Sequence, residues 1–349
     1  MAGLTYTLVP DGIDDPAHPS GGNTYDRRVI GGLGELGWAV CERAVPGRWP
    51  RPARDDLDGL GRLLASIPDG STALIDGLVA SAAAGVLVPA SARLALAVLV
   101  HMPLGVDEPG AADGERAVLR RAAAVITTSA WTRDRLVQRY GLDPRRVNVA
   151  EPGVDPADRA PGSATGGRLL CVGVLAPHKG QDVLVQALDR VRDLAWSCSL
   201  VGALDVEPAF ADRVRAAAGR LAGRVRFAGP LVGDELAAAY AATDLLVLPS
   251  RAETYGMVVG EALARAIPVV ASDVGGVPCT LGRDPSGAAP GRLVDPGDAP
   301  ALSSALRDWL ADPDLRGRWR AAAARRRTTL TGWSTTARRV GDALAGVTR

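Results

Sequence analysis

The chain of 349 residues has little of what builds disulfide frameworks and metal sites. Its four cysteines lie far apart, with no Cys-x-x-Cys pair, and it has only three histidines. The sequence therefore suggests neither a disulfide scaffold nor a zinc site, and a histidine-based metal site is not expected. Cys171 and Cys198 lie in apolar runs, where a free thiol behaves as a small hydrophobic group. Sparse, unpaired cysteine fits a reducing compartment, so we expect a cytoplasmic protein.

Net charge and long apolar runs are also lacking. Lys and Arg (40) nearly cancel Asp and Glu (39), so no global field exists to hold nucleic acid. The N-terminus has neither the basic start nor the apolar stretch of a signal peptide. The most apolar region, residues 81–100, is interrupted by Pro89 and Arg93 and is too short to span a bilayer. We expect no nucleic-acid partner and no transmembrane segment, and the question of peripheral membrane contact stays open.

Aromatic residues make up only 4% of the chain, so Ala, Val and Leu must build the core. Short apolar runs recur between helical stretches, which predicts parallel sheets with helices on both faces. A chain of this length is expected to form two domains. The strand candidates are residues 5–10, 38–44, 72–77, 93–100 and 124–129, then 168–175, 196–202, 224–229, 244–250 and 267–272.

Residues 155–168 separate the two series of strands. They are rich in Pro, Gly, Ser and Ala and show no periodicity, which is typical of a linker. We therefore predict an α/β fold with two doubly wound, Rossmann-like domains, residues 1–160 and 161–331, facing a central cleft. Because ligands bind beyond the carboxyl ends of strands in such sheets, functional residues are expected in the loops after strands.

Residues 32–37 match the glycine pattern G-x-G-x-x-G of dinucleotide sites. That motif must follow a strand and open a helix. Here it follows a helical stretch, residues 25–30, and precedes the strand candidate 38–44. The pattern therefore indicates a helix that ends in glycine, and a nicotinamide site is not expected.

Residues 249–261 carry the strongest functional pattern. A strand ends at Pro249, a loop carries Glu253, and a helix is expected to begin near Gly256. The free amides and positive dipole end of that helix would suit a diphosphate, and a glycine lets a ligand approach the backbone closely. The alternative is structural, since Ser250 and Glu253 have the Ser-x-x-Glu spacing of a capping box. This segment alone leaves both interpretations open.

The wider sequence favours the ligand site. Residues 248–250, 253–262 and 267–276 resemble the signature of retaining glycosyltransferases of family 4. The hallmark of that family is two glutamates separated by seven residues, as Glu253 and Glu261 are here. The resemblance implies the two-domain GT-B fold and a nucleotide-diphosphate sugar as donor.

The same resemblance implies roles for individual residues. Glu253 would meet hydroxyls of the donor sugar, and Glu261 would hold the ribose hydroxyls. Gly256, Met257 and Val258 would offer backbone amides to the diphosphate and sugar.

Further donor contacts are implied by position. Tyr255 lies between the two glutamates, and Leu231 ends a segment, 227–231, that resembles the one beside the nucleotide base. By analogy with the family, a C-terminal helix at about 332–349 would pack back on the N-terminal domain.

Residues 171–184 resemble the strand, loop and helix of the same family that contact the donor phosphates. Lys179, predicted to open the helix, would act as a point charge on phosphate oxygens. The alternative is a solvated lysine. The chain departs from the family at Val174, where an arginine commonly serves as a second phosphate clamp.

Residues 20–28, after the first strand, resemble the N-terminal glycine loop of the family. Gly21 and Gly22 would let the backbone reach the donor phosphate or the acceptor. The alternative is a flexible loop before a capped helix. Three polar side chains beside this loop are the predicted acceptor contacts: Asn23, Tyr25 and Asp26.

His101 ends an apolar strand, within residues 99–104. The resemblance maps it to a histidine that contacts the donor sugar near the reacting carbon, so we predict His101, Glu253 and Lys179 as catalytic residues. A satisfied core histidine is the alternative.

These features predict a retaining glycosyltransferase that uses a nucleotide-diphosphate sugar, with UDP favoured, and a small-molecule or glycan acceptor. No second carboxylate is placed as in a retaining glycosidase, so the leaving diphosphate would help to deprotonate the acceptor. We expect neither a metal nor a cofactor. Two alternatives stay open: a non-catalytic sugar-nucleotide-binding subunit, and a GT-B nucleotide-sugar epimerase or hydrolase.

Overall fold

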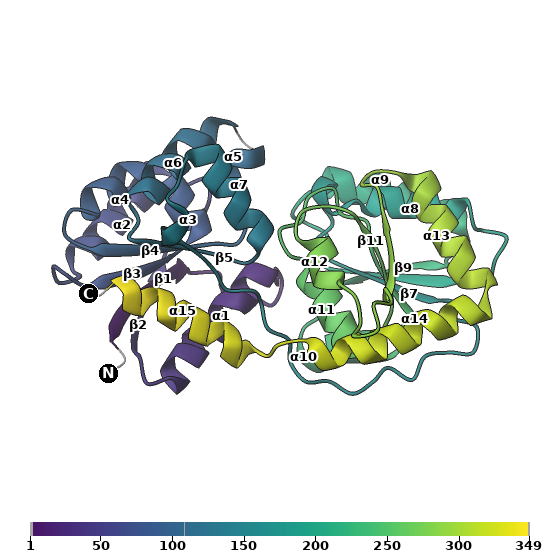
Figure 1. Ribbon diagram of the computed structural model, residues 1–349. Helices are drawn as coiled ribbons and strands as arrows, with labels where there is room; N and C mark the ends of the chain where they lie inside the picture. The colour runs from purple at the N-terminus through teal and green to yellow at the C-terminus, as the bar shows by residue number, and fades with distance from the viewer. Residues whose placement is uncertain (1–2, 108, 348–349) are drawn as a thin grey trace. The chain divides into compact units, whose positions relative to one another are not determined.

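The computed structural model describes residues 3–107 and 109–347 and divides the chain into two compact units. The first unit contains the chain up to Asp14, Gly22–Gly153, and the chain from Trp333 onward. The second unit contains Asp15–Gly21 and Val154–Gly332. Each unit is built on its own six-stranded sheet with helices around it (Figure 1).

The sheet of the first unit has the strand order β2-β1-β3-β4-β5-β6, and every neighbouring pair is parallel. Its strands are β1 (Leu4–Pro10), β2 (Ala39–Val45), β3 (Thr72–Asp76), β4 (Ala95–Val100), β5 (Ala124–Thr127) and β6 (Val147–Val149). Its α-helices are α1 (Gly21–Glu35), α2 (Arg54–Ala65), α3 (Gly77–Ala82), α4 (Ala84–Ala90), α5 (Leu104–Asp107), α6 (Ala112–Arg121), α7 (Ala130–Tyr140) and α15 (Trp333–Val347). The strand order reverses between β1 and β3.

Alternate strand residues of the first unit fill two cores, one on each face of the sheet. Helices α2, α3, α4, α6 and α7 cover the core that contains Ile75 and Val98. Helices α1 and α15 cover the core that contains Leu74 and Leu99. Because both faces are buried, the strands read as continuous Val, Leu and Ala runs rather than as alternating patterns.

The glycine-rich stretch 32–37 serves the packing of α1. A Cβ on Gly32 would lie 2.5 Å from Cβ of Ala337, so the glycine lets α15 approach α1 closely. Gly37 follows the end of α1 with a φ of +84°, a conformation that favours glycine. The helix-then-strand context is as the sequence predicts, and the stretch is not a dinucleotide motif.

The sheet of the second unit has the order β12-β11-β10-β7-β8-β9 and is also parallel throughout. Its strands are β7 (Arg168–Val172), β8 (Ser197–Val201), β9 (Val225–Gly229), β10 (Leu245–Leu248), β11 (Val269–Ser272) and β12 (Gly291–Val294). Its α-helices are α8 (Gln181–Asp189), α9 (Pro208–Ala218), α10 (Gly233–Ala241), α11 (Met257–Ala264), α12 (Val277–Leu281), α13 (Ala299–Ala311) and α14 (Pro313–Arg326). This is the Rossmann order, with its reversal between β7 and β10.

Two cores also flank the second sheet. Helices α8, α9 and α13 cover the larger one around Trp309, and α10, α11 and α12 cover the other around Tyr240. Short 3-10 turns complete the two units at Pro109–Ala111, Pro144–Arg146, Pro177–Lys179, Gly219–Leu221 and Arg327–Thr329. The predicted class, α/β with two doubly wound parallel sheets, is confirmed.

The ten predicted strands are present, with ends that differ by at most three residues, whereas β6 and β12 were not predicted. Strand β6 has only three residues. Strand β12 begins at Gly291, where a Cβ would lie 1.7 Å from the carbonyl oxygen of Val269. Strand β12 was missed because glycine in a sequence usually indicates a turn, whereas Gly291 is needed here for the close approach of two strands. Among the helices of the described chain, none is long and apolar enough to cross a membrane.

Candidate functional site

In each sheet, several candidate residues lie at or after the carboxyl ends of the two strands that flank the reversal of strand order, whereas His101 follows β4 and Leu231 follows β9. In the second unit, the loop after β7 carries Lys179 and the loop after β10 carries Glu253. In the first unit, Asp26 lies on α1 after β1, and Asp76 is the last residue of β3. Loops at such a reversal turn toward opposite faces of the sheet and leave a crevice, which is where open α/β sheets bind ligands.

In the second unit, Lys179 and Glu253 form an ion pair. Lys179 Nζ donates a hydrogen bond to Glu253 Oε2 at 2.8 Å, and the two side chains are 22% and 14% exposed. Ser250 Oγ lies 3.4 Å from the same oxygen, but the helix begins at Met257. The capping-box alternative is therefore wrong, because no helix starts after Ser250.

Lys179 is the only lysine among the 40 basic residues of the chain. It ends the 3-10 turn, and α8 begins two residues later at Gln181, so the prediction that Lys179 opens this helix is corrected. Gly180 has a φ of +68°, and a Cβ there would lie 2.1 Å from the carbonyl oxygen of Pro249. This close approach brings the loop after β7 against the end of β10 and delivers the ammonium to Glu253.

Val174 occupies the position at which the family commonly has arginine. Its carbonyl accepts a hydrogen bond from the buried side chain of Gln181 at 2.9 Å, which fixes the loop backbone. Arg251, in the loop after β10, makes a bidentate ion pair with Asp182 at 2.8 and 2.7 Å. That pair commits the guanidinium of Arg251 to a carboxylate, so Lys179 is the cation that contacts Glu253.

The start of α11 presents the predicted backbone donors. Gly256 is its N-cap with a φ of +84°, and a Cβ there would touch the side chain of Val277 at 3.3 Å. Met257 and Val258, both half-buried, are the first residues of the helix. The first amides of a helix have no acceptor within it and lie at the positive end of its dipole.

Two glycines of the loop after β11 fix the loop that carries Glu253. A Cβ on Gly275 would lie 1.6 Å from the carbonyl oxygen of Glu253. A Cβ on Gly276 would lie 2.2 Å from the carbonyl oxygen of Thr254. The two loops therefore pack backbone against backbone, which only glycine allows, and the sequence analysis did not single out these two residues as site residues.

Glu261 is held by groups that the sequence analysis missed. Tyr240 Oη donates a hydrogen bond to Glu261 Oε2 at 2.6 Å, and Arg265 lies over the ring of Tyr240 at 4.7 Å. Burial raises the pKa of Glu261 above its usual value, against the hydrogen bond from Tyr240 and the charge of Arg265. Tyr240 sits 21 residues away on α10, so no local sequence signal marks it.

The remaining predicted donor residues lie near these elements. Tyr255 is half-buried in the loop after β10, and its carbonyl accepts a hydrogen bond from Thr280 Oγ1 at 2.5 Å. Leu231 is half-buried after β9 and packs against the core that contains Tyr240.

In the first unit, His101 lies between two buried carboxylates. Its Nε2 is 2.8 Å from Oδ1 of Asp26 and 3.5 Å from Oδ2 of Asp76. The side chains of Asp26 and Asp76 are 5% and 4% exposed. Tyr25 packs edge-on against the imidazole ring, with ring centroids 5.1 Å apart.

Burial and neighbouring charges shift the protonation of Asp76 and His101. Burial, followed by the charge of Asp26, raises the pKa of Asp76 to about 7. Burial alone would lower the pKa of His101, but the charge and hydrogen bond of Asp26 and the charge of Asp76 outweigh it and raise that pKa. Asp76 was not predicted, although its position at the end of a predicted strand could have marked it.

The predicted acceptor residues differ in placement. Tyr25 is fully buried, and its hydroxyl donates a hydrogen bond to the carbonyl of Ala150 at 2.8 Å. Its predicted role as an acceptor contact is corrected, because core packing and this bond leave no surface for a ligand. Asp26 is directed at His101, and Asn23 is half-buried near the start of α1.

The two predicted loop glycines also lie at the start of α1. Gly21 is the first residue of this helix. A Cβ on Gly22 would lie 3.3 Å from Cδ2 of His101, so the glycine lets the imidazole approach the helix.

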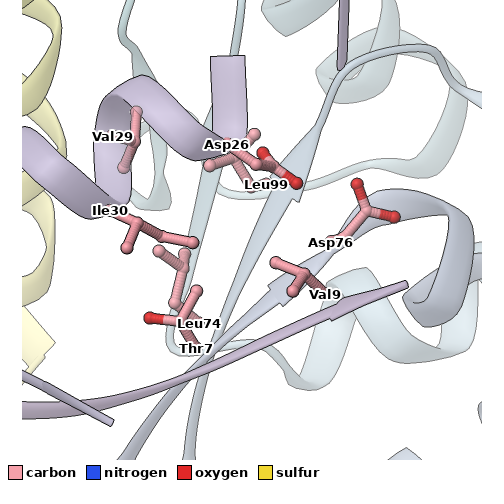
Figure 2. A pocket seen from close by; sticks show the side chains of 8 residues that line it. All are labelled: Thr7, Val9, Asp26, Val29, Ile30, Leu74, Asp76 and Leu99. Carbon is pink, nitrogen blue, oxygen red and sulfur yellow. The ribbon is translucent and has the colours of Figure 1, made fainter. Parts of the chain in front are cut away.

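A small cavity adjoins the two carboxylates, between α1 and the sheet (Figure 2). Figure 2 shows Asp26 and Asp76 above the strand side chains Val9 and Leu74. One side-chain oxygen or nitrogen atom from each of Asp26, Asp76 and His101 lies within 4.8 Å of the other two. Three such atoms could also coordinate a metal ion. The 2.8 Å contact between Nε2 and Asp26 is that of a hydrogen bond, and we interpret the group as a hydrogen-bonded network.

Two family models match the chain. Residues 21–158 match the model described as Glycosyltransferase Family 4, and residues 166–312 match the model described as Glycosyl transferases group 1. The matches fall on the two units and include the predicted residues of both. The chain belongs to glycosyltransferase family 4.

Curated relatives of this family 4 chain are D-inositol 3-phosphate glycosyltransferases. The protein of Kineococcus radiotolerans is 36% identical over 66% of the chain, and that of Salinispora tropica is 34% identical over 58%. The matched regions cover 59% and 47% of those two proteins, so the chain spans about half of their length.

Solved structures show that this family 4 chain has the GT-B fold. Sucrose-phosphate synthase from Thermosynechococcus elongatus has a TM-score of 0.77 at 21% identity and covers 97% of both chains. Anabaena HepE in complex with UDP-glucose has a TM-score of 0.78 at 19% identity, over 98% of this chain and 99% of that one.

Proposed function

We propose that this chain is a retaining glycosyltransferase that moves a sugar from a nucleotide-diphosphate donor to a small-molecule or glycan acceptor. The observation that carries the proposal is the cluster of Lys179, Glu253 and Glu261 around the start of α11, at the reversal of strand order in the second sheet. A cation, two shielded carboxylates and free helix amides together suit a diphosphate that has hydroxyl groups on either side.

The ion pair between Lys179 and Glu253 suggests how the donor binds. Each group neutralises the other at 2.8 Å. On donor binding, a phosphate oxygen would take the ammonium, and a sugar hydroxyl would donate to the carboxylate. The exchange would keep both charges compensated, which matters because a shielded unpaired charge is costly.

The chemistry follows from these roles. The amides at the start of α11 and the ammonium of Lys179 would stabilise the charge that develops on the leaving diphosphate. That diphosphate would accept the acceptor's proton on the same face of the sugar, so Glu253 is assigned to binding rather than to nucleophilic attack. His101 would contact the donor sugar near the reacting carbon.

UDP is the favoured nucleotide. HepE, which the fold resembles, was solved with UDP-glucose, and the resembled family commonly uses UDP. The carboxylate of Glu261, held by Tyr240, suits the vicinal hydroxyls of a ribose, which favours a ribonucleotide over a deoxyribonucleotide.

The test is calorimetric titration with UDP, GDP, ADP and dTDP, followed by turnover assays of the UDP-sugars with candidate acceptors. We expect one ribonucleotide to bind the wild type, and Glu261→Gln to weaken it at least about tenfold, or 1.4 kcal/mol. Glu235→Gln, an exposed change on α10, is the matched control. Absence of binding by every nucleotide would contradict the proposal. Binding without transfer would favour the non-catalytic subunit, and donor breakdown without acceptor would favour the hydrolase.

A further inference from the structure

The nitrogen Nε2 of His101 faces two carboxylates that come from different elements. Asp26 lies on α1 and is 2.8 Å from Nε2, and Asp76 ends β3 and is 3.5 Å from it. Strands β3 and β4, the second of which ends directly before His101, are parallel neighbours and end at the same edge of the first sheet. A satisfied core histidine needs only one acceptor, so a second buried carboxylate, which is costly to desolvate, calls for another explanation.

The carboxylates are themselves fixed. Asp76 Oδ1 accepts hydrogen bonds from the amides of Leu78 and Val79 at 2.7 and 3.4 Å, as the N-cap of α3. Its other oxygen lies 3.5 Å from Nε2 of His101, and the Asp76 carboxyl also shares a hydrogen bond with Asp26, which helps to raise its pKa. Asp26 is held on α1, whose neighbouring residue Gly22 lies against the Cδ2 edge of the ring.

The ring is fixed as well as its partners. Tyr25 packs edge-on against it, and the hydroxyl of Tyr25 is anchored on a backbone carbonyl. Atoms Cδ2 and Nε2 therefore form the edge of the imidazole that faces α1 and the carboxylates. Nδ1 lies on the opposite edge, as the geometry of a five-membered ring requires.

We propose that Asp26 and Asp76 are positioning residues that bind the Nε2–H of His101 and so present Nδ1 as the nitrogen that contacts the substrate. The inference rests on the proposed function, since it assigns the way in which His101 serves glycosyl transfer. It adds two positioning residues of the first unit and states which ring atom contacts the substrate.

The charge balance decides the state of the ring. The Asp26 carboxylate at 2.8 Å favours the imidazolium, and Asp76 adds to this effect once it ionises above its pKa of about 7, because an opposite charge within about 4–6 Å stabilises the cation. The titratable groups that face the ring are Asp26, Asp76 and the neutral phenol of Tyr25. Nδ1 then carries a proton and donates a hydrogen bond to a substrate oxygen, and the imidazolium places positive charge near the leaving group.

The first test is NMR of protein labelled with 15N in its histidine rings. The chain has three histidines, His18, His101 and His178, so His101→Gln assigns the signal. We expect His101 to titrate above its usual value and to keep the Nε2–H form on deprotonation. Asp26→Asn should lower its pKa by about one unit or more, and Asp76→Asn should lower it by less. Asp58→Asn, exposed on α2, should leave the signal unchanged.

The second test is kinetic and uses the same variants. We expect Asp26→Asn to lower kcat by about 10–100-fold with little change in the donor KM, and to move the alkaline limb of the pH profile in parallel with the NMR pKa. Asp26→Glu should restore part of the rate.

Three results would overturn the inference. These are a neutral ring protonated at Nδ1, a His101 pKa unaffected by either asparagine variant, and a signal that Mn²⁺ or Zn²⁺ at stoichiometric concentration broadens or shifts, which would make the group a metal site. Circular dichroism of each variant separates loss of folding from loss of positioning. The NMR readout needs no turnover, so failure of the proposed function leaves this test standing, and the reverse also holds.

Discussion

The ammonium of Lys179 is a chemical exception in a chain whose other basic side chains are all arginines. Arginine is a planar fork that binds a carboxylate through two parallel hydrogen bonds, whereas lysine is a compact charge that turns easily from one acceptor to another. Lysine suits an ion pair that would have to separate when the donor binds, because its single charge can move from the carboxylate to a phosphate oxygen. Under the proposed function, the ion pair with Glu253 at 2.8 Å is a contact that the donor would replace.

Substitution of Lys179 tests this difference. Lys179→Arg should bind Glu253 bidentately and weaken the nucleotide about tenfold or more, and Lys179→Met, which removes the charge, should weaken it further. The measurement is calorimetric titration with the best nucleotide. Equal affinity of the wild type and Lys179→Arg would contradict the argument.

Asp76 makes the stability of the first unit depend on pH. Its pKa is about 7 in the folded chain against an ordinary 3.8, so folding holds its proton more tightly. The stabilisation that this proton gives is fully present below about pH 4 and is lost as the pH rises through 7. The Asp76→Asn variant keeps a neutral side chain that can still cap α3.

We therefore expect Asp76→Asn to gain stability relative to the wild type as the pH rises from 4 to 8, by up to about 4 kcal/mol. Urea unfolding at a series of pH values measures it, and Asp58→Asn is the exposed control. A difference that stays constant over this pH range would show that Asp76 is ionised in the fold.

At the scale of elements, the positions of the loops could be predicted from the sequence, but the contacts that hold them could not. The carboxyl ends of β10 and β4 mark Glu253 and His101, because parallel strands present their following loops at one edge. The partners Tyr240 and Asp76 come from other elements, and only the fold brings them near. Tyr25 was predicted from its position after β1 to contact a ligand, but its side chain is buried in the core, which the position alone does not reveal.

The loop after β11 gives an element-scale prediction. A methyl group on Gly275 would overlap the carbonyl oxygen of Glu253. The φ of Gly275 is +58°, which is unfavourable for residues other than glycine. Gly275→Ala should therefore displace the loop of Glu253, lower stability by at least about 1–3 kcal/mol, and weaken nucleotide binding. Thermal unfolding and calorimetric titration measure the two effects.

Gly219→Ala is the control for that variant, because Gly219 has an ordinary backbone conformation and open space around its Cα. It should change neither property beyond about 0.5 kcal/mol. If Gly275→Ala bound the nucleotide with wild-type affinity, the packing of the two loops would be irrelevant to the site.

At the scale of the whole molecule, the chain order and the compact units do not coincide. Helix α15, the last of the chain, belongs to the first unit, and Val340 and Leu344 are fully buried in the same core as Tyr25 and Leu33. Most of the second unit, Val154–Gly332, lies in the sequence between the last two of the three segments that form the first unit. The core of the first unit is therefore complete only when α15, which follows the second unit in the chain, has been synthesised.

A chain that ends at residue 332 tests this dependence. Removal of α15 would expose one face of the first sheet and the apolar side of α1, and the loss of even one large buried side chain costs about 2–5 kcal/mol. With total domain stabilities of about 5–15 kcal/mol, the first unit should lose cooperative unfolding while the second keeps it. Hydrogen exchange read by mass spectrometry resolves the two units.

The point variant Gly32→Val offers a milder version of the same test, because its side chain would meet Ala337 where α1 and α15 touch. It should raise exchange in α1, α15 and the edges of the first sheet, and leave β7 to β12 protected. The nucleotide should still stabilise the second unit in both variants, since Lys179, Glu253 and Glu261 all lie within it. If the nucleotide lost its affinity together with α15, the assignment of nucleotide binding to the second unit alone would be wrong.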